Sequence, residues 1–79
     1  MIYEIIRHIA TLSTYRNMNG ERRAKELNII SWSGKDCVFD IRDWNEDHTV
    51  CSKGLTLSAD EVENLIKGYS EYKATIQEV

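Results

Sequence analysis

The sequence predicts an α+β fold, a four-stranded antiparallel curved sheet followed by one C-terminal helix (ββββα). Three observations predict it: two strand-like runs around a glycine turn, a short apolar strand at residues 55–57, and a helix start directly after that strand. The chain has 79 residues, no proline and a hydrophobic fraction of 42%, which favours an ordered globular protein. We therefore expect a single domain over residues 1–79.

Residues 2–13 fit two interpretations. The apolar residues of this segment are Ile2, Ile5, Ile6, Ile9 and Leu12. Their spacing fits a helix about as well as a strand, and on spacing alone a helix is the slightly better interpretation. The content of β-branched residues favours a strand instead. We expect a strand that is bulged or strongly twisted.

A hairpin is predicted around the turn at residues 33–36. Residues 26–32 read as a strand whose two faces are both partly apolar. Residues 37–44 alternate more sharply. One face of this second run carries Cys37, Phe39 and Ile41, and the other carries Val38, Asp40, Arg42 and Trp44.

The last third of the chain predicts a helix. Ser58 and Glu61 form a capping box, and Asp60 suits the positive end of the helix dipole. An apolar stripe follows at helical spacing. Its members are Val62, Leu65, Ile66, Tyr69, Tyr72 and Ile76. One small sheet does not need so long a stripe to cover it, so we expect a second copy of the chain to pair with it.

Charge is unevenly distributed along the chain. The net charge is -3. Residues 1–35 hold six basic and three acidic side chains, whereas residues 36–57 and 58–79 each hold two basic and five acidic ones. Binding of a charged ligand depends on the local field of the face that meets it. An acidic helix is therefore compatible with a basic sheet face that binds nucleic acid.

The sequence favours a cytoplasmic protein. No apolar stretch reaches the roughly 18 residues needed to span a membrane, so we expect no membrane association. The N-terminus lacks the order of basic, apolar and small residues of a secretory signal. In such a compartment Cys37 and Cys51 should be reduced thiols.

An ordered set of motifs runs through residues 25–67. Asp40-Ile41-Arg42 is followed closely by an aromatic residue and a polar loop, and then by Lys53-Gly54 and a short strand that leads into the helix. This combination resembles the DNA-binding domain of the transcriptional coactivator positive cofactor four and, more closely, its small bacterial YdbC-like relatives. The resemblance implies an N-terminal strand and a homodimer whose helices pack across the two-fold axis. It also implies binding to single-stranded DNA.

Trp32 and Trp44 are the candidate stacking residues. Each ends a strand-like run, and aromatic faces beside fixed positive charge can stack bases and hold phosphates. The resemblance places stacking aromatics close to both positions. The alternative is that both are core residues, which composition alone makes about equally good.

The candidate cations are Lys35, Arg42 and Lys53, which match basic residues of the family. Arg23 and Lys25 are added from their position at the entry to the second strand. The alternative for any one of them is a solvated side chain, and Arg42 has Asp40 two residues away as an ion-pair partner.

Catalysis and metal binding have little support in the sequence. Nucleophilic chemistry needs a nucleophile, a base and an orienting group together. Cys37, His48 and Cys51 lack the paired spacing of a zinc site. We predict no catalytic residue, no metal and no cofactor.

The sequence thus predicts a homodimer that binds single-stranded DNA with little sequence preference in transcription, replication or repair. Single-stranded RNA and the transcription machinery are further candidate partners. The alternative is a protein-interaction module in which the tryptophans are core residues.

Overall fold

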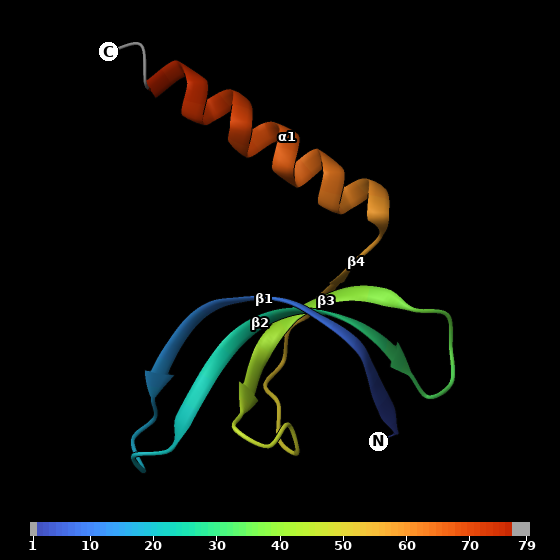
Figure 1. Cartoon of the computed structure of the whole chain (residues 1–79), viewed down its shortest axis with the longest axis vertical. Helices are drawn as coiled ribbons and strands as arrows, with labels where there is room; N and C mark the ends of the chain where they lie inside the picture. Colours follow the sequence, from blue (N-terminus) through green and yellow to red (C-terminus); the bar gives the residue numbers. More distant parts are fainter. Residues whose placement is uncertain (1, 77–79) are drawn as a thin grey trace.

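The computed structural model describes residues 2–76, which form one four-stranded sheet and one helix. The elements are β1 (Tyr3–Arg16), β2 (Arg22–Trp32), β3 (Val38–Asn45), β4 (Leu55–Leu57) and α1 (Ala59–Ile76). The strands lie in the order β1-β2-β3-β4, and every neighbouring pair is antiparallel. Figure 1 shows the sheet as an arch with α1 on its convex side. The predicted fold is confirmed.

β1 is a bulged strand at the edge of the sheet. Its register with β2 shifts three times, and the pairing skips Ile6, Ile9 and Leu12. An extra residue at a bulge bends the strand and increases its twist. The predicted bulged strand is confirmed for this segment, and the helical interpretation of residues 2–13 is wrong.

An apolar face of the sheet lies toward α1. Ile29, Phe39 and Leu57 line a cavity of about 390 Å³ together with Ser58 and Ala59 at the start of the helix. The strand registers place six apolar side chains on this convex face: Leu27, Ile29, Phe39, Ile41, Leu55 and Leu57. All six are half-buried or exposed. The convex face therefore carries apolar side chains that the single chain covers only in part.

The concave face holds the buried core. Ile30 and Trp44 are fully buried there, and so are the polar residues Asn28 and Asp40. Bending a sheet toward one face brings the side chains of that face closer together. The arch thus lets the concave side chains bury one another, which explains how a single sheet layer excludes water from polar groups.

The start of α1 follows the predicted capping box. The Ser58 amide donates to Glu61 Oε1 at 2.8 Å, and the Glu61 amide donates to Ser58 Oγ at 3.1 Å. The side chains of α1 are half-buried at most, and its apolar stripe is open to solvent, with Tyr69 61% exposed. Within the described part of the chain, no helix is long and apolar enough to cross a membrane.

Gly54 permits a close approach between the loop after β3 and the strand itself. A Cβ at Gly54 would lie 2.5 Å from the Cβ of Arg42 and would also collide with the carbonyl oxygen of Ile41. Only a residue without a side chain fits against β3 at this point. The position of β4, and of the helix that follows it, depends on this contact.

We predict that Gly54→Ala lowers the free energy of unfolding by about 1–3 kcal/mol, because the added methyl group has to push β3 and the loop apart. Urea unfolding followed by circular dichroism measures the change. The matched control is Lys53→Ala at the neighbouring exposed position, which should change stability by less than about 0.5 kcal/mol. Equal midpoints for the two variants would contradict the prediction.

Candidate nucleic-acid interface

Trp32 and Arg42 form an aromatic and cationic pair that meets across the concave face, since Arg42 lies opposite Glu26, six residues from Trp32 along β2. The Arg42 guanidinium carbon lies 4.5 Å from the centre of the Trp32 ring. Both residues line a hollow of about 370 Å³ together with Ser33 and Thr56. Pockets of this size hold small ligands, and a flat base is among the groups that stack on such a pair. The structure therefore brings together the two predicted residues on which a stacking site depends.

Asp40 holds Arg42 in place. Arg42 Nε donates to Asp40 Oδ1 and Arg42 Nη2 donates to Asp40 Oδ2, each at 2.7 Å, and Arg42 Nη1 donates to the Ser52 carbonyl at 3.3 Å. Such a two-pronged pair fixes the plane of the guanidinium. The hydrogen bonds to Asp40 also raise the pKa of Arg42 above its usual value. The Arg42 charge is thus compensated within the chain.

Lys35 and Lys53 are exposed on two loops that border this pair. The Lys35 amide donates to the Trp32 carbonyl at 3.0 Å, which closes the hairpin turn just after Trp32. Lys53 precedes Gly54, whose backbone touches Arg42. Both backbones are therefore fixed beside the stacking pair, while the long side chains reach into solvent.

Trp44 was predicted to stack a base, but the structure places it in the core. Its exposed fraction is 0%, and its ring packs 5.3 Å from Tyr3 and 5.6 Å from His48, measured between ring centres. Trp44 lies on the concave face as the alternation predicts, but the arch and the loop that carries His48 enclose it. The ring is a core residue and is not available to a base in this structure.

Arg23 and Lys25 lie away from the Trp32 pair. Lys25 is next to Glu26, which lies opposite Arg42, so what separates it from the pair is the sheet itself. The alternation of β2 also points both cations to the face opposite Trp32. Lys25 is exposed and paired in register with Asp43. The structure therefore leaves these two residues outside the interface around Trp32.

A partly buried polar network on the concave face was not predicted. His48 Nε2 lies 2.9 Å from Glu26 Oε1, and Asn28 Nδ2 donates to the same oxygen at 3.0 Å. His8 Nδ1 lies 2.7 Å from Asn28 Oδ1. The Tyr3 hydroxyl donates to the His48 carbonyl. The only sequence signal was the alternation of Glu26 and Asn28 with apolar neighbours, which a solvated strand face explains equally well.

The network lowers the pKa of Glu26. Burial acts to raise it, but the hydrogen bonds from Asn28 and His48 together with the nearby histidines outweigh burial, so the net pKa lies below its usual value. His48 itself has a left-handed backbone, with φ of 58°. The contacts to Glu26 and Tyr3 hold it in this uncommon conformation.

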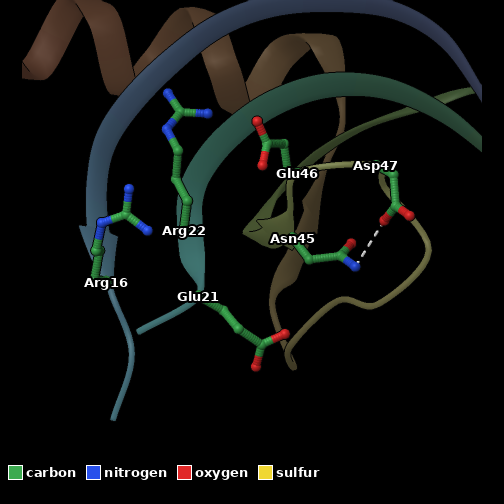
Figure 2. Close-up of a pocket in the computed structure, with 6 residues that line it drawn as sticks. All are labelled: Arg16, Glu21, Arg22, Asn45, Glu46 and Asp47. Atoms are coloured by element: carbon green, nitrogen blue, oxygen red, sulfur yellow. Dashed lines mark hydrogen bonds between the residues drawn. The ribbon is translucent and has the colours of Figure 1, made fainter. Parts of the chain in front are cut away.

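A larger hollow of about 490 Å³ lies at the opposite end of the strands, shown in Figure 2. Two guanidiniums face three carboxylates across it, and an amide completes its lining. The residues are Arg16, Glu21, Arg22, Asn45, Glu46 and Asp47. Asn45 Nδ2 donates to Asp47 Oδ1 at 2.8 Å. The mixed charge and polar lining suit a nucleic acid less well than the hollow at Trp32.

The cysteines are free thiols, with Cys37 exposed and Cys51 half-buried. Among residues 2–76, no group of three or more His, Cys, Asp or Glu side chains is placed to hold a metal ion. Among the described residues, the pair of Trp32 and Arg42 is therefore the best candidate for a binding site.

The family model described as Transcriptional Coactivator p15 (PC4) matches residues 19–68. The chain belongs to the PC4 family. The match covers every candidate interface residue, from Arg23 to Lys53, and continues into α1. The predicted resemblance is confirmed.

A bacterial relative supports this assignment. The chain is 40% identical over 60 residues to a protein of Treponema pallidum (strain Nichols) described as uncharacterized. The similarity covers 76% of this chain and 66% of the relative, so the chain spans just under two thirds of the relative's length. This relative implies a bacterial source for the chain.

We predict that Glu26 makes part of the stability of the protein dependent on pH. Its folded pKa lies below the unfolded value of about 4.3, so its contribution is complete above that pH and is lost as the pH falls through the folded pKa. Urea unfolding across acidic pH should therefore give a smaller pH slope for Glu26→Gln than for the wild type. The control Glu63→Gln, at an exposed position of α1, should retain the wild-type slope, and a wild-type slope in both variants would contradict the prediction.

Proposed function

We propose that this protein binds single-stranded DNA as a homodimer, with little sequence preference, in transcription, replication or repair. The observation that carries the proposal is the pair of Trp32 and Arg42 in an open hollow on the concave face, bordered by two exposed lysines. Membership of the PC4 family supports a DNA-binding, coactivator-like role. The transcription machinery is accordingly a candidate partner.

The proposed mechanism is binding without turnover. A base stacks at Trp32, and Lys35 and Lys53 neutralise phosphates on either side of it. Stacking tolerates any base, because every base has a π-face, so little sequence preference follows. Single-stranded RNA presents the same bases and phosphates and is a second ligand to test. A duplex is a poor ligand, because its bases already stack on one another.

The proposed homodimer follows from uncovered apolar surface. Leu65, Ile66 and Tyr69 on α1 are 57–61% exposed, and the convex face of the sheet is only partly covered. A 79-residue chain has little stability to lose to such exposure. A second copy would bury the helix stripes and convex faces and leave both concave faces open to DNA.

The alternative is a protein-interaction module, which the same apolar surface favours. The two functions differ in what they predict for tryptophan fluorescence. Trp44 is buried, so quenching by an added oligonucleotide would report on Trp32. A module that binds only protein would show no change.

We predict that mutations of the lysines and of Trp32 have separable effects. Lys35→Ala or Lys53→Ala should weaken binding to all sequences alike and reduce the slope of log affinity against log salt concentration, because each removes a contact that releases a counterion. Trp32→Ala should leave this slope nearly unchanged and cost about 1–3 kcal/mol per stacked base. Fluorescence anisotropy with a labelled oligodeoxythymidylate measures both quantities.

The control for this experiment is Lys67→Ala, a cation on α1 away from the concave face, which should bind as the wild type does. A matched duplex serves as the competitor. Equal affinity for duplex and single strand, together with full binding by Trp32→Ala, would leave only general electrostatic attraction and would refute the proposed binding mode.

We predict that Ile66→Asp or Tyr69→Asp dissociates or unfolds the homodimer, because a carboxylate cannot be buried without a partner in an apolar interface. Light scattering at micromolar concentration measures the mass. Asn64→Asp adds the same charge on the polar side of α1 and should remain dimeric. A wild-type protein that is monomeric under these conditions would refute the homodimer.

A further inference from the structure

Asp40 is a fully buried carboxylate, and its two oxygens are both used by Arg42. The exposed fraction of Asp40 is 0%, and that of the Arg42 side chain is 14%. A buried carboxylate is costly unless it is paired and hydrogen-bonded. The pair therefore constrains Arg42 far more than a solvated ion pair on a strand would.

The hydrogen bonds of Arg42 leave little of the guanidinium free. Two of its five N–H groups point to Asp40 and a third points to the Ser52 carbonyl. A phosphate clamp normally uses the same two-pronged edge of arginine that Asp40 occupies here. At most two N–H groups of Arg42 therefore remain for a phosphate, and the edge that normally grips one is occupied.

The charge of the pair leads to the same conclusion. Asp40 compensates the Arg42 charge within hydrogen-bond distance, at 2.7 Å. A cation that is already neutralised by the protein releases few counterions when a phosphate approaches. Lys35 and Lys53 are exposed and carry no such partner in the contacts of residues 2–76, so they are the better phosphate contacts.

The guanidinium also lies over an aromatic ring. It lies 4.5 Å from the Trp32 ring centre, in the hollow that both residues line, and the backbone at Gly54 packs against the stem of Arg42. Guanidinium planes stack on aromatic faces and on bases. Arg42 thus extends the aromatic surface of Trp32 toward the ligand.

We propose that Arg42 binds the nucleic acid as a stacking surface for a base, layered on Trp32, and that Asp40 is the positioning residue that holds it flat. This inference rests on the proposed function, since it describes how the same site meets single-stranded DNA. It assigns the phosphate contacts to Lys35 and Lys53 and gives Arg42 a role that depends on its shape.

Asp40→Asn separates this role from that of a phosphate-binding cation. The substitution makes each chain more positive by one charge, so a phosphate clamp at Arg42 should bind an oligodeoxythymidylate more tightly and with a steeper salt slope. A positioned stacking surface should instead bind roughly fivefold more weakly, with an unchanged salt slope. The matched control is Asp36→Asn, which makes the same charge change at an exposed position of the hairpin turn and should bind at least as tightly as the wild type.

A double-mutant cycle with Trp32→Ala distinguishes positioning from a general effect on stability. If Asp40 acts through the stack, Asp40→Asn should cost less than about twofold once Trp32 is absent. Thermal melts confirm that each variant is folded at the assay temperature. Undiminished binding by folded Asp40→Asn, or an equal loss with and without Trp32, overturns the inference.

Arg42→Lys decides the matter if Asp40→Asn does not fold. Lysine keeps the charge and can still pair with Asp40, but its ammonium group is not planar and cannot stack on a base. We expect a loss of roughly fivefold or more, and a smaller loss overturns the inference. Failure of the proposed function can be told apart from failure of this inference. If the proposed function were wrong, the wild type would not bind the oligonucleotide, or Trp32→Ala would bind as the wild type does.

Discussion

The curvature of the sheet is the constraint on which the rest of this structure depends. Three bulges in β1 bend one edge of the sheet, and the absence of a Cβ at Gly54 lets the returning loop lie against β3. The bend makes the concave side chains bury one another. A single sheet layer can therefore enclose Trp44 and keep Asp40 from water without a second layer packed on that face.

The curvature explains why polar residues are buried beside apolar ones on the concave face. Buried polar groups are tolerated when they are hydrogen-bonded, and Glu26, Asn28 and Asp40 all are. The convex face carries Leu27, Ile29, Phe39 and Ile41, which the single chain covers only in part. The partly covered apolar side chains of the convex face favour the proposed pairing with another copy.

Much of the fold could be predicted from the sequence because its signals are local. The capping box at Ser58, the glycine turn at residues 33–36 and the alternation of β3 each involve residues close in the chain. β1 was ambiguous for a physical reason. Each bulge inserts one unpaired residue after two paired ones, so the inserted apolar residues Ile6, Ile9 and Leu12 lie three apart in the sequence. This spacing is close to the 3.6 residues per turn of a helix.

The site was only partly predictable. The pairing of Arg42 with Asp40 follows from their positions two apart on one strand face. The closeness of Trp32 does not follow from the hairpin, because Arg42 lies opposite Glu26, six residues from Trp32 along β2, and the two side chains meet only because the sheet is arched. The burial of Trp44 depends on the curvature and on the loop that carries His48, which is a tertiary effect that alternation does not report. The histidine network around Glu26 joins residues 20 and 22 positions apart, beyond the reach of any local pattern.

Charge and shape have separate roles in the proposed site because Arg42 is paired with the buried Asp40. On a chain with a net charge of -3, long-range attraction to DNA is weak, so affinity must come from contacts within the site. If Arg42 stacks on a base as proposed, it adds stacking area without adding charge, and the exposed Lys35 and Lys53 would release the counterions. Pairing through the convex faces would place two such sites on one particle, and a strand long enough to reach both would gain affinity from their connection without any new contact.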